Sequence, residues 1–198
     1  MIQGIIFDLD GTLVESSLDF SLIRQQIGCP DDIDVLKHVE SLGCKDLQDK
    51  ANQIIIEHEN QDAQSAKALA GMAVLLSFIE RQQIPCAIVT RNSKAASELK
   101  LTQNKINIGT VLTRECYPAK PAPDALIAIA TQWQIEPKHI MYVGDYLYDI
   151  QAANNAGMIA CFINHGIETH YQHLSDIIVQ SLDELLTIIK QYSLKKAP

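Results

Sequence analysis

Two carboxylates one residue apart end the first apolar run of the chain. Asp8 and Asp10 directly follow residues 5–7, which are predicted to form a buried strand. Two acids at the carboxyl end of such a strand lie where α/β sheets bind their ligands, whereas a simple turn needs only one Asp or Asn and a Gly. Crowded carboxylates repel each other unless a cation neutralises them, and hard oxygen ligands favour Mg²⁺. The pair therefore predicts a reactive site with Mg²⁺ and substrate phosphate oxygens.

A second polar cluster follows the strand-like run 86–89. Thr90 and Asn92 offer a hydroxyl, a backbone N–H and a side-chain amide, all of which can bind phosphoryl oxygens. Because a Thr at a strand end is more often structural, this cluster indicates a site only together with the others. Arg91 lies between them, and two interpretations remain open: contact with substrate, or a solvated surface charge.

Two more clusters complete the candidate site. Lys120 lies in the segment Ala-Lys-Pro-Ala-Pro-Asp, whose prolines favour a rigid loop that leads into a helix. Asp145 and Asp149 follow the strand-like run 140–143, and a helix that begins near residue 147 would let both acids face a metal. Acids at a helix start also stabilise the helix dipole, so this spacing has a purely structural explanation as well.

The four clusters, taken in order, resemble the motifs of the haloacid dehalogenase-like phosphohydrolase superfamily. The first of them reads Asp-Leu-Asp-Gly-Thr over residues 8–12 and the fourth begins Gly-Asp at residues 144–145. This resemblance implies that Asp8 is the nucleophile, forming an aspartyl-phosphate, and that Asp10 is the general acid and base. It also implies that Lys120 pairs with the nucleophile and the phosphoryl charge.

The same resemblance implies a set of metal ligands. These are the Asp8 carboxylate, the Asp10 backbone carbonyl and Asp145, with Asp149 as a ligand or as a support for one. The expected cofactor is Mg²⁺. Dehalogenases of the superfamily work without the metal and lack an acid/base Asp at position 10, so carbon–halogen cleavage is disfavoured.

Strand-like runs that alternate with helical patterns predict a parallel sheet with crossover helices. We expect an α/β, doubly wound, Rossmann-like core at residues 1–14 and 70–198, with five strands and a frayed end at 193–198. Residues 15–69 show no convincing strand run and are expected to form an inserted helical unit, which the resemblance identifies as a cap. The expected strands cover residues 5–7, 86–89, 110–112, 140–143 and 159–163, and the expected helices lie near 72–82, 93–101, 123–133, 147–156 and 182–192.

Composition limits the partners. The chain has 198 residues, 47% of them apolar, which suffices for a real core. A net charge of −8 without a strong basic cluster makes nucleic acid and anionic membranes poor partners. Five widely spaced cysteines without a Cys-x-x-Cys pair favour a reducing, cytoplasmic location, and no apolar run approaches the length of a membrane span. The oligomeric state does not follow from the sequence.

The expected activity is hydrolysis of a small phosphate monoester, most similar to the phosphoglycolate phosphatase-like branch. Two alternatives stay open: a phosphomutase of the β-phosphoglucomutase type, and a family member that binds a ligand without turnover. Arg24 lies in the first expected cap helix and could grip a second anionic group of the substrate, or could be one more solvated helix charge.

Overall fold

The computed structural model describes residues 1–194 and shows one sheet of six parallel strands. The strand order is β3-β2-β1-β4-β5-β6, so the chain winds outward from β1 in both directions. The strands are β1 (Gly4–Phe7), β2 (Cys86–Val89), β3 (Thr110–Leu112), β4 (Ile140–Gly144), β5 (Ile159–Ile163) and β6 (Ile177–Val179). The doubly wound α/β fold expected from the sequence is confirmed, whereas most of the expected frayed end, residues 195–198, lies outside the described residues.

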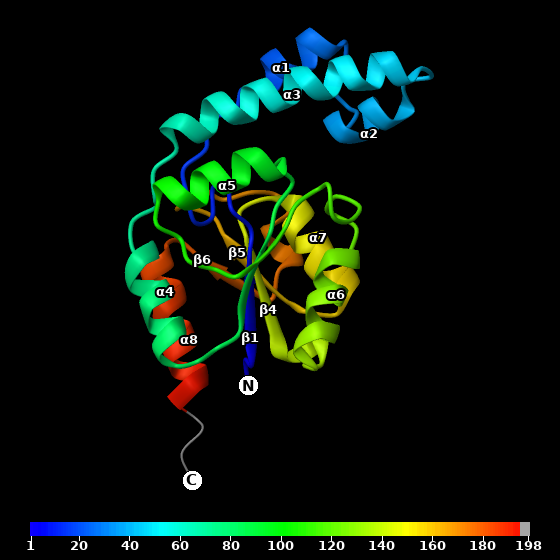
Figure 1. Ribbon diagram of the computed structural model, residues 1–198. Helices are drawn as coiled ribbons and strands as arrows, with labels where there is room; N and C mark the ends of the chain where they lie inside the picture. The colour runs from blue at the N-terminus through cyan, green and yellow to red at the C-terminus, as the bar shows by residue number, and fades with distance from the viewer. Residues whose placement is uncertain (195–198) are drawn as a thin grey trace.

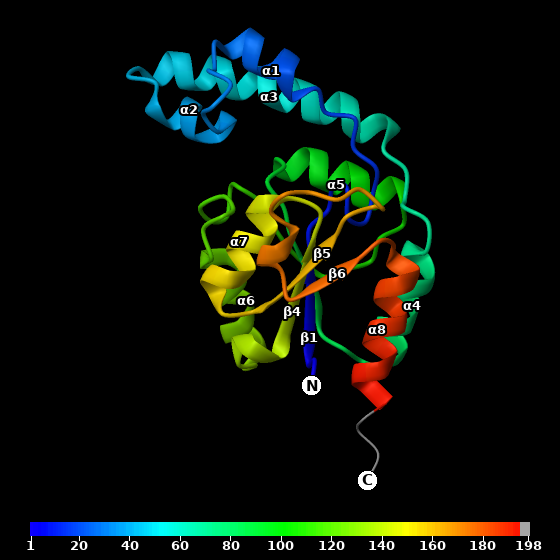
Figure 2. The ribbon, with the colours of Figure 1, turned by 180° about the vertical axis from the view of Figure 1, so that it is seen from behind.

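The central strands are buried on both faces because helices cover the sheet from each side. Figures 1 and 2 show α4 and α8 against one face and α6 and α7 against the other. Two apolar clusters result, one around Phe7 and Leu75 and the other around Tyr142 and Leu126. The helices of this part are α4 (Met72–Arg81), α5 (Lys94–Gln103), α6 (Asp124–Trp133), α7 (Leu147–Ala156) and α8 (Leu182–Leu194), with 3-10 turns at Pro137–His139 and Gln172–Leu174.

The prediction of five strands was wrong, because β6 is a sixth. Its three residues, Ile177–Val179, pair in parallel with β5 at the edge of the sheet. Three apolar residues carry no periodicity that distinguishes a strand from a loop. Hydrogen bonds to β5 define β6 as a strand, and only the fold shows that residues 177–179 lie beside β5.

Residues 15–69 fold as three helices that lie over one end of the sheet (Figures 1 and 2). They are α1 (Phe20–Ile27), α2 (Val35–Ser41) and α3 (Lys45–Ser65), and we call residues 15–69 the helical segment. Side-chain oxygens of Asp19 and Asp34 cap the amino ends of α1 and α2. Ile23, Val39 and Ile55 form part of an apolar cluster that belongs to this segment alone.

The long α3 packs across α5, so the helical segment meets the rest of the described chain along one junction. We call this remainder, residues 1–14 and 70–194, the sheet domain. Among the described residues, no helix combines the length and the apolar character needed to cross a membrane.

Candidate active site

The four polar clusters predicted from the sequence converge at the carboxyl edge of the sheet. Asp8 and Asp10 follow β1, Thr90 follows β2, and Asp145 follows β4. Lys120 comes from the loop after β3, and all of these residues line a cleft of about 550 Å³. The helical segment forms the opposite wall of the cleft through residues such as Phe20, Ile23 and Val35. The cleft therefore has a charged floor and a largely apolar roof.

Lys120 holds two of the acids together. Its Nζ lies 2.5 Å from Oδ1 of Asp8 and 2.6 Å from Oδ1 of Asp149, and all three side chains are buried. Tyr142 adds a hydrogen bond from its hydroxyl to the same Asp149 oxygen, while the backbone N–H of Tyr146 binds the other. Asp149 is therefore bound at both oxygens. Burial lowers the pKa of Lys120, but the negative charges of Asp149 and Asp8 outweigh this effect, so the pKa is raised.

Asp145 completes a group of three carboxylates with Asp8 and Asp149. One ligand atom from each lies within 4.8 Å of the other two. The backbone of Gly11 comes so close to Asp145 that a Cβ at Gly11 would lie 2.1 Å from Oδ2 of Asp145. Gly11 also has a φ of +68°, so glycine is needed there for both reasons. Three hard oxygen donors against one ammonium leave negative charge that a divalent cation fits.

Burial and the proximity of these acids raise the pKa values of two of them. Burial raises the pKa of Asp8 to about 7, although Lys120 opposes the shift. Burial and the negative charges of Asp149 and Asp8 raise the pKa of Asp145 to about 8. The folded, metal-free protein thus holds protons that carboxyls in an unfolded chain release near pH 4. Metal binding must displace these protons, because only the charged carboxylates are good ligands.

We expect the stability of the metal-free protein to fall as pH rises from about 4 towards 8, because the folded state binds more protons than the unfolded state in this range. We further expect Mg²⁺ to raise the melting temperature more at pH 8 than at pH 6. Thermal unfolding with and without Mg²⁺ at the two pH values measures this difference. The Asp145→Asn variant is the control and should lose most of the Mg²⁺ effect, and equal effects at both pH values in the parent protein would contradict the prediction.

The Asp10 carboxyl points away from this group of acids. Its Oδ2 accepts a hydrogen bond from Nδ2 of Asn92 at 2.8 Å, and its Oδ1 lies 2.5 Å from Nζ of Lys100. Burial raises the pKa of Asp10, and Lys100 and Asn92 act in the opposite direction. The carboxyl group of Asp10 is therefore bound by Asn92 and Lys100, and it is not part of the group formed by Asp8, Asp145 and Asp149.

The residues of the second cluster have different surroundings: Thr90 and Asn92 lie on the floor of the cleft, and Arg91 reaches the junction with the helical segment. Thr90 and Asn92 are buried, and the backbone N–H of Asn92 binds the Thr90 hydroxyl oxygen at 3.2 Å. Arg91 reaches the helical segment, where its Nη2 binds Asp34 at 2.7 and 2.9 Å. Its Nη1 also binds the carbonyl of Lys120, and its guanidinium lies 4.6 Å above the ring of Tyr148. Arg91 therefore lines the cleft as part of an ion pair with Asp34 and is not a freely solvated charge.

Arg24 also lines the cleft. Its Nη1 binds the carbonyl of Pro30 at 2.7 Å, and the same atom contacts the carbonyl of Ile33. These bonds tie α1 to the loop that leads into α2. A role in substrate binding, one of the two possibilities that the sequence left open for Arg24, would have to use the other nitrogen atoms of the guanidinium.

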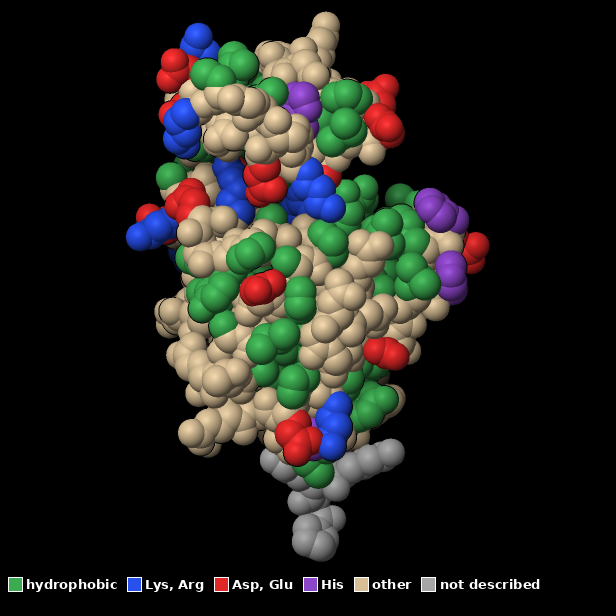
Figure 3. Space-filling model, turned by 90° about the vertical axis from the view of Figure 1, so that its right-hand side faces the viewer, with side chains coloured by type: hydrophobic (Ala, Val, Ile, Leu, Met, Phe, Trp, Pro, Cys, Tyr) green, Lys and Arg blue, Asp and Glu red, His purple; other side chains and the backbone are tan. Residues whose placement is uncertain are grey.

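Three ion pairs at the junction were not anticipated from the sequence. In each, the helical segment supplies the acid and the sheet domain the base: Asp34 with Arg91, Glu59 with Arg114, and Asp62 with Lys100. Figure 3 shows acidic and basic side chains gathered in this zone between the two parts. No local pattern predicts such pairs, because the partners lie 38 to 57 residues apart in the chain.

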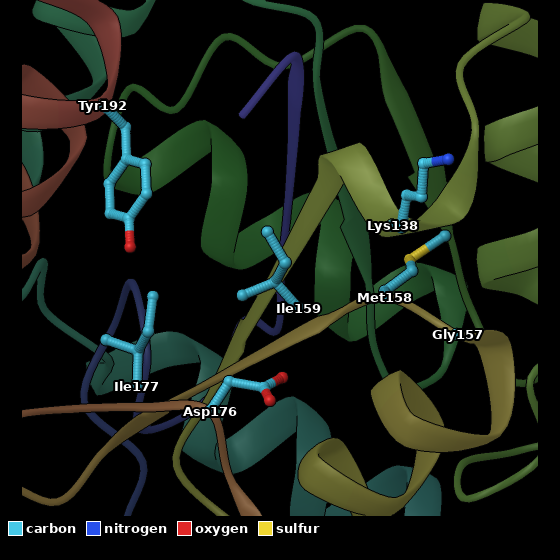
Figure 4. Close-up of a pocket in the computed structure, with 7 residues that line it drawn as sticks. All are labelled: Lys138, Gly157, Met158, Ile159, Asp176, Ile177 and Tyr192. Carbon is cyan, nitrogen blue, oxygen red and sulfur yellow. The ribbon is translucent and has the colours of Figure 1, made fainter. Parts of the chain in front are cut away.

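A second pocket, of about 350 Å³, lies at the opposite edge of the sheet, next to the amino ends of β5 and β6. Figure 4 shows that Lys138, Asp176 and Tyr192, which line this pocket, do not point toward one another. Asp176 accepts a hydrogen bond from the backbone of Ala160, and Lys138 pairs with Glu136 on the surface. This pocket has no converging set of reactive groups, so the cleft at the carboxyl edge is the candidate site.

Comparisons with known proteins identify the family of this chain. The family model described as "Haloacid dehalogenase-like hydrolase" matches residues 5–163. A haloacid dehalogenase-like hydrolase domain-containing protein of Arabidopsis thaliana is 33% identical over 82% of this chain and 71% of its own length. Hexitol phosphatase A of Escherichia coli is 27% identical, with 96% of this chain and 95% of that protein covered. A phosphoglycolate phosphatase of Pseudomonas putida is 25% identical, with 93% and 78% covered.

Solved structures share the fold. A hydrolase from Pseudomonas syringae superposes with a TM-score of 0.79 at 17% identity, covering 96% of this chain and 98% of the other. A structure described as a predicted phosphoglycolate phosphatase from Haemophilus somnus gives a TM-score of 0.74 at 21% identity, covering 95% and 98%. At these identities the likeness concerns the fold alone.

Proposed function

This chain belongs to the haloacid dehalogenase-like hydrolase family, and from that premise we propose that it is a Mg²⁺-dependent phosphatase of small phosphorylated metabolites. The observation that carries the proposal is the buried Asp8, held by Lys120 at 2.5 Å within a group of three carboxylates. A phosphate monoester is a dianion that resists attack by an anion, so the site must neutralise charge first. Lys120 supplies one positive charge at the nucleophile itself.

In the first step, an oxygen of Asp8 attacks phosphorus in line with the leaving group. The bond from phosphorus to the ester oxygen breaks as the new bond to Asp8 forms, and the product is an aspartyl-phosphate. The departing oxygen keeps the electron pair of the broken bond and takes a proton from the Asp10 carboxyl. The protonated oxygen leaves as part of the alcohol. Thr90 and Asn92, which line the cleft, would bind the phosphoryl oxygens.

In the second step, Asp10 acts as the base. It takes a proton from water while the water oxygen attacks phosphorus, and the bond from phosphorus to Asp8 breaks to release phosphate. The arrangement supports both roles, because the two carboxyls are bound to different lysines, Asp8 to Lys120 and Asp10 to Lys100. One carboxyl can therefore form a covalent bond while the other exchanges a proton.

Mg²⁺ fits the residues that are present. Asp8, Asp145 and the Asp10 backbone carbonyl would hold it, and Asp149 would support them through its bonds to Lys120 and Tyr142. When bound, the ion adds positive charge at the phosphoryl oxygens and orients the substrate. Mg²⁺ fits this site for two reasons: the available ligands are oxygen atoms, and Lys120 alone does not balance the negative charge of the carboxylates.

We propose that the helical segment, residues 15–69, acts as a cap over the α/β core of residues 1–14 and 70–198. It forms the apolar wall of the cleft, and its Asp34 holds Arg91. The leaving group of the substrate would lie between these surfaces. Two relatives are named for phosphoglycolate and hexitol phosphates, so both anionic and neutral leaving groups belong among the candidates.

The test is phosphate release from a panel of monoesters that includes phosphoglycolate, hexitol phosphates and glycerol 2-phosphate, with Mg²⁺ or with EDTA. We expect release that requires Mg²⁺, because the carboxylates otherwise repel the substrate. Phosphate should appear without any added bisphosphate, which separates a phosphatase from a phosphomutase. Absence of release from every ester would contradict the proposal and favour a phosphomutase or a binding function.

The Arg24→Ala variant, run on the same panel, tests the role of Arg24 in the proposed cap. If Arg24 grips a second anionic group, KM should rise for phosphoglycolate and stay unchanged for glycerol 2-phosphate. An equal change for both esters would limit Arg24 to its bonds with the carbonyls of Pro30 and Ile33.

A further inference from the structure

Lys100 is a buried lysine to which the proposed reaction assigns no task. It lies in α5, and its side chain has no exposed surface, although lysine is almost never fully buried unless it is paired. Its Nζ lies 2.5 Å from Oδ1 of Asp10 and 2.6 Å from Oδ2 of Asp62. One ammonium group therefore joins the proposed general acid and base to the last turns of α3.

Two donors fix the orientation of the Asp10 carboxyl group. Lys100 binds Oδ1, and Nδ2 of Asn92 binds Oδ2 at 2.8 Å, so the carboxyl plane cannot rotate without the loss of a hydrogen bond. Each carboxylate oxygen keeps a further lone pair for proton transfer. The side chain of Asp10 is 20% exposed and lines the cleft. The group is thus held from behind while it faces the place of the substrate.

Asp62 holds Lys100 from the other side. Its Oδ1 accepts hydrogen bonds from the backbone N–H of Ser17 at 2.6 Å and from the Ser17 hydroxyl at 2.8 Å. The Ser16 hydroxyl reaches its Oδ2 at 3.2 Å. Ser16 and Ser17 lie in the connection between β1 and α1, where the chain enters the helical segment. Asp62 is therefore anchored at this entry. The position of the ammonium is set by both parts of the protein.

Stability alone does not explain this arrangement. Removing an ammonium and a carboxylate from water costs about as much as their attraction returns, and an apolar side chain of similar size would often do as well. We infer that Lys100 is a positioning residue, whose ammonium, held by Asp62, fixes the Asp10 carboxyl where it passes a proton to the leaving oxygen. This inference rests on the proposed function, because it takes Asp10 as the general acid.

In the first step of the reaction, a misplaced Asp10 should matter only where the leaving group needs a proton. An alkoxide leaves poorly unless its oxygen is protonated as the bond to phosphorus breaks, whereas p-nitrophenolate leaves readily as the anion. Loss of positioning should therefore slow an alkyl phosphate and spare p-nitrophenyl phosphate. A residue that only stabilises the fold would affect both esters alike.

The experiment compares kcat/KM for glycerol 2-phosphate and p-nitrophenyl phosphate, since kcat/KM covers the steps up to departure of the leaving group. The variants are Asp62→Asn and the double variant Lys100→Met/Asp62→Asn. The double variant keeps the single net negative charge of the wild-type cluster, and Asn can still accept hydrogen bonds from Ser17. Relative to Asp62→Asn, we expect kcat/KM for the alkyl ester to fall roughly 10²-fold, and that for the aryl ester to change little.

The Asp10→Asn variant separates failure of this inference from failure of the proposed function. It should lose roughly 10²- to 10⁴-fold on the alkyl ester and much less on the aryl ester. If it slows both esters equally, Asp10 is not the acid and the proposed function is wrong at that point. If Asp10→Asn is selective while loss of Lys100 slows both esters equally or neither, Lys100 does not position Asp10 and the inference is overturned.

A second comparison covers the case in which the double variant does not fold. In the Asp10→Asn background, Lys100→Met should cause no further selective loss on the alkyl ester, because the group that Lys100 positions is already disabled. A further selective loss in that background would show that Lys100 acts on the reaction by another route, and would overturn the inference.

Discussion

We expect the Asp8→Asn variant to lose turnover by a factor on the order of 10⁴ to 10⁶, the range found when single members of a catalytic triad are removed from a hydrolase. The amide is a poor nucleophile and cannot form the aspartyl-phosphate. Release of phosphate from the preferred ester, with Mg²⁺ present, measures the effect. The same variant should not become labelled when it is incubated with a radioactive phosphate donor and then denatured.

The fold should survive this substitution. Asn has nearly the shape of Asp, and Lys120 keeps its 2.6 Å contact with Asp149 when the Asp8 charge is gone. Burial raises the pKa of Asp8 to about 7, so the native carboxyl is itself costly to charge, and its neutral replacement relieves that cost. Thermal unfolding of the variant provides the control. Appreciable turnover by a folded Asp8→Asn protein would show that the nucleophile is another residue.

The Lys120→Met variant should lose about 10²- to 10³-fold in kcat, as expected when one charged group that stabilises the transition state is removed. It should also be less stable by roughly 3–5 kcal/mol, because Asp8 and Asp149 remain buried without their counter-charge. Steady-state kinetics at saturating Mg²⁺ and denaturant unfolding measure the two effects separately.

Two further variants separate catalysis from stability at Lys120. The double variant Lys120→Met/Asp149→Asn removes one positive and one negative charge, so it should recover much of the lost stability without recovery of activity. Lys138→Met is the matched control, since Lys138 is an exposed lysine that pairs with Glu136 far from the cleft. It should retain full activity. Wild-type activity in a folded Lys120→Met protein would remove Lys120 from the mechanism.

Most of the fold followed from local patterns. The apolar runs and helical spacings of residues 5–7 and 70–192 predicted five of the six strands and the helices of the sheet domain, because burial on both faces leaves continuous apolar strands. The strand β6 was not predicted, because three residues at a sheet edge are too few to show a periodicity. The helical character of residues 15–69 was also predicted, and the three helices are present.

The floor of the candidate site followed from the same local information. Asp8, Thr90 and Asp145 each come directly after a strand, and parallel strands bring their carboxyl ends to one edge of the sheet. The sequence alone therefore sufficed to bring these residues together. Their catalytic and metal-binding roles stay predictions that the variants above test.

The tertiary structure alone decided how the charges are paired. Nothing near Lys100 in the chain distinguishes it from a solvated helix lysine, yet it is buried between Asp10 and Asp62, which are 90 and 38 residues away in the chain. Arg91 likewise pairs with Asp34 across the junction. Strand and helix periodicity is a local property, so a sequence records it directly. The partner of a charge depends on which surfaces the folded chain brings within a few ångströms, and this is settled only when the helical segment packs on the sheet domain.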